Sequence, residues 1–218
     1  SVIESSGATP VPIQLHERTG FSFNADEVIS KITPRTRLII LNSPANPTGT
    51  VIPPAKLRDL AAFCDCHGIR YISDEIYHGI TYGRRAVTAV GLDPHAFVIN
   101  GFSKYFAMTG WRLGWMVVPS DLVRTVESLA QNLYISPPAL SQAAALAAFD
   151  CRSELEANVA RYRRNRDLLL AELPKAGFNS FAPADGAFYL YADVSDMTND
   201  SDALCRRMLA EAGVAATP

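Results

Sequence analysis

The sequence lacks any long uninterrupted apolar run and any excess of charge of one sign. No stretch approaches the ~18 consecutive apolar residues of a membrane-spanning helix. Its start, Ser1-Val2-Ile3-Glu4, has neither the basic nor the apolar region of a signal peptide. Hydrophobic residues make up 48% of the 218 residues, charged residues 19%, and the formal net charge is -2. Nothing in this balance attracts nucleic acid or anionic lipid, so we expect neither partner, no membrane contact and a cytoplasmic location.

Cysteine is scarce as well. Cys64, Cys66, Cys151 and Cys205 are too few and too irregularly spaced for a disulfide framework in a chain of this length. Cys64 and Cys66 fall within a helical pattern, where side chains two positions apart point to nearly opposite faces and cannot readily chelate one metal ion. The four histidines show no spacing typical of a metal site or a catalytic triad. We therefore expect free thiols and no metal site.

Lysine is rare too, with four residues against sixteen arginines. Lys31, Lys56 and Lys175 lie in polar, helix-like contexts, whereas Lys104 lies in the run Gly101–Gly114, which is rich in glycine and aromatic residues. A single lysine after a strand is usually a solvated surface residue. The small residues around Lys104, however, would let a ligand approach the backbone closely. Lys104 is therefore the candidate nucleophilic amine.

The first half of the chain alternates short, apolar, β-branched runs with amphipathic helical runs. This pattern predicts an α/β fold, a mostly parallel sheet with helices on both faces. We expect one crossover helix from Asn24 or Asp26 to Lys31. Another should run from Ala55 to Cys66 and end at Gly68. The predicted strands are residues 11–15, 37–41, 70–74, 97–100 and 114–118.

After Pro119 the pattern becomes helical, and beyond Gly177 short apolar segments precede a last helix, which is typical of part of a small α+β domain. We therefore divide the chain into residues 1–150, a large domain, and residues 151–218, an interdomain helix with part of a small domain. The predicted helices in this half are residues 121–133, 137–149, 153–176 and 201–212.

Two further motifs precede Lys104 and follow predicted strands. Asp74 ends the strand 70–74, at the edge of a parallel sheet where ligands bind, and Tyr77 is close enough to reach the same ligand. Alone, Asp74 could equally cap the next helix, and Asn46-Pro47-Thr48-Gly49 would be read as a simple turn. Their occurrence in this order before Lys104 favours one shared site.

These motifs resemble the pyridoxal-phosphate site of the class I and II aminotransferases, which are aspartate aminotransferase-like enzymes of fold type I. The resemblance implies that Lys104 forms a Schiff base with the cofactor aldehyde. It also implies that Asp74 keeps the pyridine nitrogen protonated, so that the ring acts as an electron sink. Tyr77 would donate a hydrogen bond to the ring oxygen. The domain of residues 1–150 would then be the C-terminal part of the large cofactor-binding domain.

The resemblance assigns three more residues to cofactor binding. Asn46 would donate to the ring oxygen, and Arg112 would bind the phosphate, because its planar fork suits a pair of phosphate oxygens. Ser103 would add a hydroxyl to the phosphate site. Gly101 departs from the family pattern, since many relatives have a serine there, so one phosphate contact is expected to be missing.

The resemblance extends from Pro10 to Pro218 but covers only part of a family member. The sequence lacks an initiating Met and stops at Ala216-Thr217-Pro218 without a helix cap, as expected for an excised piece. Family members begin earlier, with a helix N-terminus that binds the phosphate and an aromatic residue that stacks on the ring. They continue to an arginine that binds the substrate α-carboxylate. We therefore expect these 218 residues alone to be a poor catalyst.

The activity implied by the resemblance is transfer of an amino group between an amino acid and a 2-keto acid, at a site on a homodimer interface. Three alternatives stay open. A carbon-sulfur lyase and a cyclopropane-forming synthase share the same residues and differ in how the carbanion decays. The third is a transcription regulator whose aminotransferase-like domain only senses the cofactor, which an upstream winged-helix segment would reveal.

Overall fold

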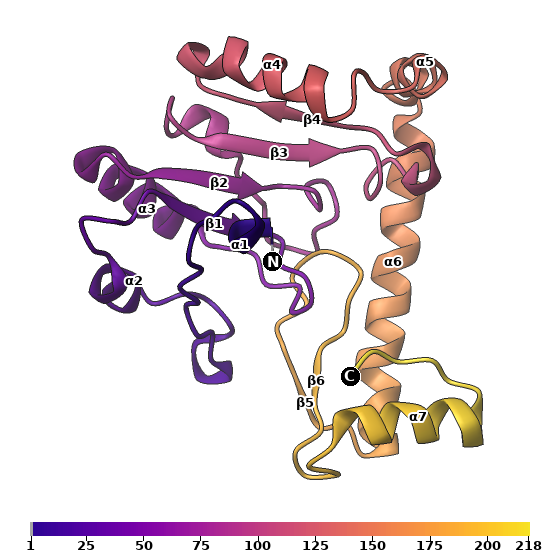
Figure 1. Cartoon of the computed structure of the whole chain (residues 1–218). Coiled ribbons are helices and arrows are strands. Elements are labelled where there is room, and N and C mark those ends of the chain that lie inside the picture. Colours follow the sequence, from indigo (N-terminus) through magenta and orange to yellow (C-terminus); the bar gives the residue numbers. More distant parts are fainter. Residues whose placement is uncertain (1) are drawn as a thin grey trace.

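The computed structural model describes residues 2–218. Its main sheet has the order β1-β2-β3-β4. β1 pairs with β2 and β2 with β3 in parallel, whereas β4 runs antiparallel to β3. The first three strands point toward the long helix α6 (Arg152–Glu172), as Figure 1 shows. The predicted mostly parallel α/β sheet is confirmed, with an antiparallel strand at one edge. The strands are β1 (Leu38–Asn42), β2 (Arg70–Asp74), β3 (Phe97–Gly101) and β4 (Gly114–Val117).

The prediction of a strand over residues 11–15 is wrong. These residues belong to no helix or strand, and Val11 is 58% exposed. The backbone N–H of Gln14 donates to the Glu27 carboxylate at 3.3 Å, not to a neighbouring strand. Pro12 explains the failure, because a proline has no N–H with which to join a sheet.

The helices before and after β1 begin and end at residues whose local chemistry favours those boundaries. The Asn24 side chain accepts a hydrogen bond from the Asp26 N–H at 2.9 Å and so caps α2 (Ala25–Lys31), which decides between the two predicted starts, Asn24 and Asp26. α3 (Pro54–His67) begins with a proline, whose missing N–H costs nothing there. It ends where Gly68 adopts the left-handed conformation, with φ 62°.

One hydrophobic core lies between α3 and a single face of the sheet. Each fully buried leucine of such a core contributes about 1.5–3 kcal/mol relative to an exposed one. The core includes Phe23, Val28, Leu57, Leu60, Ala61, Cys64, Tyr71 and Val98. All four cysteines are free thiols, as expected.

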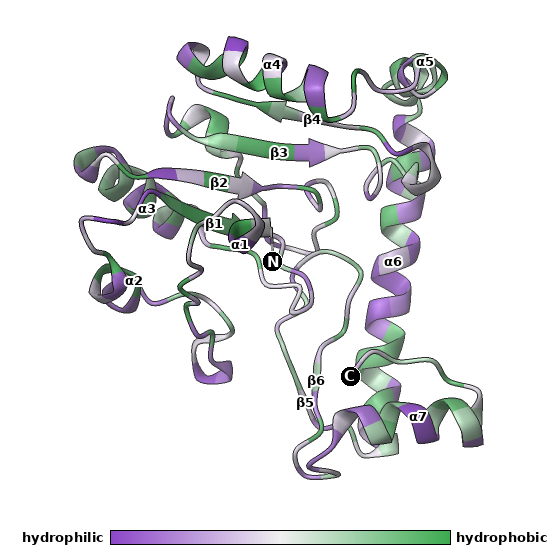
Figure 2. Ribbon diagram, viewed as in Figure 1, coloured by the Kyte–Doolittle hydropathy of each residue, from purple (hydrophilic) through white to green (hydrophobic). Residues whose placement is uncertain are grey.

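The face of the sheet opposite to this core is partly exposed. Leu38, Ile40 and Ile99 on that face are 42%, 49% and 37% exposed, so residues 2–218 leave this apolar face accessible. Figure 2 shows that β1 and most of β3 are hydrophobic along their length.

The second half of the chain is mainly helical. α6 runs from the neighbourhood of α5 to the small β5–β6 pair and α7 (Figure 1). The predicted helix over 153–176 ends as α6 at Glu172 and continues as a 3-10 turn, Leu173–Ala176, because Pro174 lacks an N–H. No helix of the described residues is long and apolar enough to cross a membrane. The remaining elements are α1 (Val2–Ser5), α4 (Val123–Leu133), α5 (Ala139–Ala148), β5 (Ser180–Phe181), β6 (Ala192–Asp193) and α7 (Ser201–Ala212).

A segment before β6 contacts the loops at the carboxyl ends of β1 and β2 through its backbone. The Gly186 N–H donates to the Gly49 carbonyl at 2.8 Å, and the Tyr82 N–H donates to the Asp185 carbonyl at 2.7 Å. A Cβ atom at Gly186 would lie 2.8 Å from the Pro44 side chain, closer than real Cβ contacts allow. The two backbones therefore approach this closely only because residue 186 is glycine.

We predict that Gly186→Ala lowers the free energy of unfolding by roughly 1–3 kcal/mol, the usual cost of an overpacked contact that cannot relax. Urea unfolding of the chain measures the change. Gly91→Ala is the matched control, because a Cβ at Gly91 meets no atom of residues 2–218 within 4 Å. Equal stability of the two variants would contradict the close approach.

Candidate functional site

The loops that leave β1 and β2 are held together by hydrogen bonds around the last residue of β2, Asp74. The Asp74 carbonyl accepts from the Ser43 N–H at 3.2 Å and from the Asn42 side chain at 3.3 Å. The Asn42 carboxamide oxygen in turn accepts from the Asn46 N–H at 2.7 Å. Parallel pairing therefore continues past the strand ends and brings the Asn46 motif to the same edge of the sheet as Asp74.

Lys104 lies in the loop after β3, between two aromatic rings. Its Nζ is 5.5 Å from the centroid of the Tyr77 ring and 5.8 Å from that of Phe188. Both distances fall within the range of cation–π contacts. No carboxylate of residues 2–218 forms an ion pair with Lys104, so no salt bridge among these residues holds its Nζ. The structure thus brings two of the predicted site residues, Lys104 and Tyr77, together.

Tyr77 is 2% exposed, and its hydroxyl pairs with the hydroxyl of Tyr189. Its ring meets the rings of Phe188 and Tyr189 edge to face, with centroids 5.5 and 5.6 Å away. Burial and the Tyr189 contact raise the pKa of Tyr77, while the Asn46 side chain opposes the rise. The Tyr77 hydroxyl therefore stays protonated at neutral pH and can donate a hydrogen bond. Asn46 belongs to the same group of side chains.

Asp74 is a half-buried carboxylate. Burial raises its pKa above the ordinary value, and the negative charge of Glu75 adds to the rise. The Ile76 N–H, which donates to Asp74 Oδ1 at 3.2 Å, and the nearby His78 oppose the rise. No lysine or arginine in the described part of the chain forms an ion pair with it. The site thus offers a negative charge that a positively charged ligand group would neutralise.

Ser103 and Arg112 lie in the same loop, and Thr109 forms hydrogen bonds with both of them. The Thr109 hydroxyl donates to the Ser103 carbonyl at 2.6 Å, and Arg112 Nη1 donates to the Thr109 carbonyl at 3.1 Å. Arg112 is exposed, in the left-handed conformation with φ 52°, and forms no ion pair within residues 2–218. Most of its guanidinium donors are therefore available to an anion such as phosphate.

Close packing fixes the backbone on either side of Lys104. Gly101 pairs with Gly114 across β3 and β4, and a Cβ at Gly101 would lie 3.1 Å from the Gly114 Cα. A side chain at residue 101 would require these neighbours to move by a few tenths of an ångström. Gly79, with φ 91°, packs so closely against the Tyr105 ring that a Cβ there would lie 2.4 Å from it.

Phe188 and Tyr189 were not predicted to be part of the site. Both lie in the apolar run 187–192, which suggests a strand but enters β6 only at Ala192. Gly186, directly before this run, indicates only a close backbone approach and not which side chains reach Lys104.

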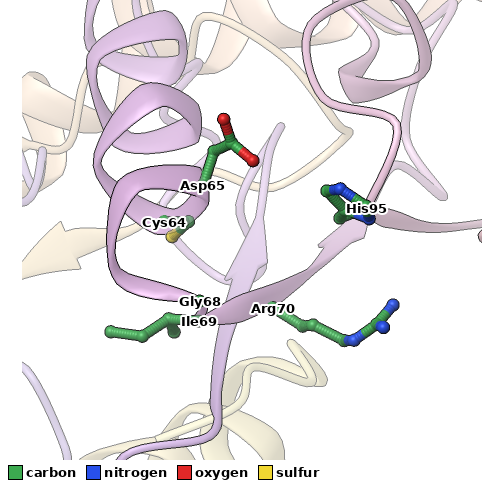
Figure 3. Close-up of a pocket in the computed structure, with 6 residues that line it drawn as sticks. All are labelled: Cys64, Asp65, Gly68, Ile69, Arg70 and His95. Atoms are coloured by element: carbon green, nitrogen blue, oxygen red, sulfur yellow. The ribbon is translucent and has the colours of Figure 1, made fainter.

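A surface cavity of about 190 Å³ lies at the other end of β2 (Figure 3). Arg70, which begins β2, and His95 line it together with the end of α3. Four residues along the strand, roughly 13 Å, separate Arg70 from Asp74. The cavity is therefore distinct from the group around Lys104.

Comparisons with known proteins agree on one family. A family model described as Aminotransferase class I and II matches residues 1–218. The chain is 46% identical over 222 residues to the valine–pyruvate aminotransferase of Mycobacterium tuberculosis and 38% identical over 221 residues to an arginine–pyruvate transaminase of Pseudomonas aeruginosa. These alignments cover 100% and 98% of this chain.

Among solved structures, an aspartate aminotransferase from Thermus thermophilus with maleate aligns with a TM-score of 0.91 at 34% identity and covers 99% of this chain. The chain covers 57% and 56% of the two relatives above and 57% of this solved chain. It thus spans just over half the length of the proteins that it matches.

We predict that Asp74→Asn stabilises the cofactor-free chain at pH 7 but not at pH 3. Because folding raises the pKa of Asp74 above the ordinary 3.8, the folded chain binds this proton more tightly than the unfolded chain. The free energy of unfolding therefore falls as pH rises through that window. Asparagine keeps an acceptor for the Ile76 N–H, and because it is uncharged its burial carries no cost of removing a charge from water. Thermal unfolding of both proteins at both pH values measures the effect, and an Asn variant that is less stable at pH 7 would contradict it.

Proposed function

This chain belongs to the class I and II aminotransferases, and we propose that it forms the core of the pyridoxal-phosphate site of a transaminase. The whole protein would move an amino group between an amino acid and a 2-keto acid. One observation carries the proposal: Lys104 Nζ lies over the Tyr77 ring without an ion pair in residues 2–218, and Asp74, three residues before Tyr77, is a half-buried carboxylate that pairs with no lysine or arginine of these residues.

The residues present fit this cofactor. Asp74 would hold its ring nitrogen by charge, and Tyr77 and Asn46 would donate to its ring oxygen. Arg112 and Ser103 would hold the phosphate, where a bidentate guanidinium gives both charge and orientation. When bound, pyridoxal phosphate supplies an aldehyde that condenses with amines and a ring that withdraws electrons from the substrate α-carbon.

Lys104 is the residue that would move protons. Its Nζ would attach to the cofactor in the resting site and, once displaced by a substrate amine, accept the proton from the substrate α-carbon. The buried Tyr77 ring excludes water from one side of the amine. Phe188, on the segment before β6, lies against the same amine and limits its direction of movement.

The proposal leaves the substrate pair open. The two relatives named above are a valine–pyruvate and an arginine–pyruvate enzyme, so membership of the family is compatible with very different side chains. We infer only an amino acid and a 2-keto acid as substrates, a homodimer as the working form and the cytoplasm as its location.

We predict that Lys104 carries the covalent label when the full-length protein is mixed with pyridoxal phosphate and reduced with borohydride. Peptide mass spectrometry locates the label. Lys104→Arg should abolish it, whereas Lys56→Arg should retain it, because Lys56 Nζ is already bound to the Ser22 hydroxyl and the Phe23 carbonyl. A label on Lys56 or another lysine in the unsubstituted protein would show that Lys104 is not the attachment site.

We further predict that Asp74→Ala lowers transaminase turnover about 10²–10³-fold, the usual loss when one buried catalytic charge or donor is removed. The assay uses the full-length protein with a panel of amino donors and keto acids, at saturating cofactor. Asp93→Asn is the control, because Asp93 is also a buried acid but follows the 3-10 helix Ala89–Gly91, outside the proposed site. Near-normal turnover of Asp74→Ala with cofactor bound would refute the role.

A further inference from the structure

Glu75 is a buried acid that the proposed reaction does not use. It is 2% exposed, directly after Asp74, and three groups contact its carboxylate. Oε1 accepts from the Ser73 hydroxyl at 3.0 Å and from the Ala89 N–H at 2.8 Å. Oε2 lies 3.2 Å from His78 Nδ1. His78 Nδ1 is thus placed to donate a hydrogen bond to this carboxylate.

These three partners come from three different segments. Ser73 belongs to β2, Ala89 begins the 3-10 helix Ala89–Gly91, and His78 follows Tyr77 in the turn after the strand. Backbone hydrogen bonds hold the same turn. The Glu75 N–H donates to the Ile99 carbonyl of β3 at 2.8 Å, and the His78 N–H donates to the Glu75 carbonyl at 2.9 Å. Glu75 therefore joins the end of β2, its turn and a distant loop.

We propose that Glu75 is a positioning residue: through Ser73, Ala89 and His78 it fixes the turn that presents Asp74 and Tyr77 to Lys104. This inference rests on the proposed function. Asp74 is the residue directly before Glu75, and Tyr77 follows Glu75 by two residues. Any change in the path of residues 74–78 therefore changes the directions of both the carboxylate and the phenol.

A carboxylate is a costly way to fill this space. Burying a charge loses hydration, and an apolar side chain of similar volume often gives equal or greater stability. What the carboxylate adds is direction, because it accepts from groups in three segments at once. Its negative charge also acts on the site, since it raises the pKa of Asp74. Burial lowers the pKa of His78, while the charge of Glu75, a backbone hydrogen bond to Ser43 and the charge of Asp74 oppose the fall.

The test compares Glu75→Ala, Glu75→Gln and Asp93→Asn in the full-length protein loaded with pyridoxal phosphate. Asp93 is the matched control, since it is 4% exposed and also bonds a backbone N–H, that of His95, at 2.7 Å. Each variant is measured for its melting temperature, for kcat and KM, and for the pH midpoint of the absorbance of the bound cofactor. The midpoint reports the surroundings of the cofactor without turnover.

Glu75→Ala should lower kcat roughly 10- to 100-fold with little change in KM, because small misplacements of catalytic groups have effects of that size. It should also shift the absorbance midpoint. Glu75→Gln, which keeps an acceptor for Ser73 and Ala89, should recover most of kcat. Asp93→Asn, which keeps the acceptor for the His95 N–H, should leave kcat and the midpoint unchanged.

A Glu75→Ala protein that is less stable but keeps the unsubstituted kcat and midpoint would overturn the inference, since Glu75 would then be purely structural. If Glu75→Ala does not fold, His78→Ala replaces it, because it removes only the Oε2 partner. That variant should show a smaller fall in kcat and a shift in the midpoint, and no change in either would overturn the inference. If the unsubstituted protein attaches no cofactor to Lys104, the proposed function fails and this inference fails with it.

Discussion

Asp74 places a half-buried negative charge at the carboxyl end of β2, and the surrounding segments are arranged about it. Its carbonyl holds the start of the loop after β1, and its carboxylate accepts the Ile76 N–H of its own turn. Burial raises the pKa of Asp74, and no lysine or arginine of residues 2–218 pairs with its charge. Such a group costs stability, so its presence is best explained by a ligand that supplies the missing positive charge.

The second constraint is the close contact between segments far apart in the sequence. Tyr189, 112 residues after Tyr77, pairs with its hydroxyl, and Phe188 lies against the Lys104 amine. Backbone hydrogen bonds at Gly49 and Gly186 bring these segments close enough for the aromatic contacts to form. The segment that precedes β6 therefore takes part in the site, although none of its residues carries a charge there. Its movement would change the space around Lys104 directly.

Features set by local chemistry were predictable from the sequence. Residues 70–74 and 201–212 form a strand and a helix with the predicted bounds, and Asn24, one of the two predicted starts, caps its helix. The predicted strand over residues 11–15 was wrong, because the short apolar run was given more weight than the missing N–H of Pro12. The division of the chain near residue 150 stays a prediction.

The candidate site was predictable where motifs follow strands, because parallel strands end at one edge of a sheet. Lys104, Asp74, Tyr77 and Asn46 could be selected in this way. Phe188 and Tyr189 could not, since their proximity depends on how α6 and the backbone contact at Gly186 return the chain to the sheet. The buried position of Glu75 was not predictable for another reason. A sequence does not reveal which of two adjacent acids, Asp74 or Glu75, points into the protein interior.

The most direct test of the account is a crystal structure of the full-length protein grown with pyridoxal phosphate. The account predicts continuous density from Lys104 Nζ to the cofactor and an Asp74 carboxylate oxygen about 2.7–2.9 Å from the ring nitrogen, the length of a charge-assisted hydrogen bond. The phosphate should lie on Arg112. A cofactor attached to another lysine, or a ring nitrogen that faces away from Asp74, would contradict it.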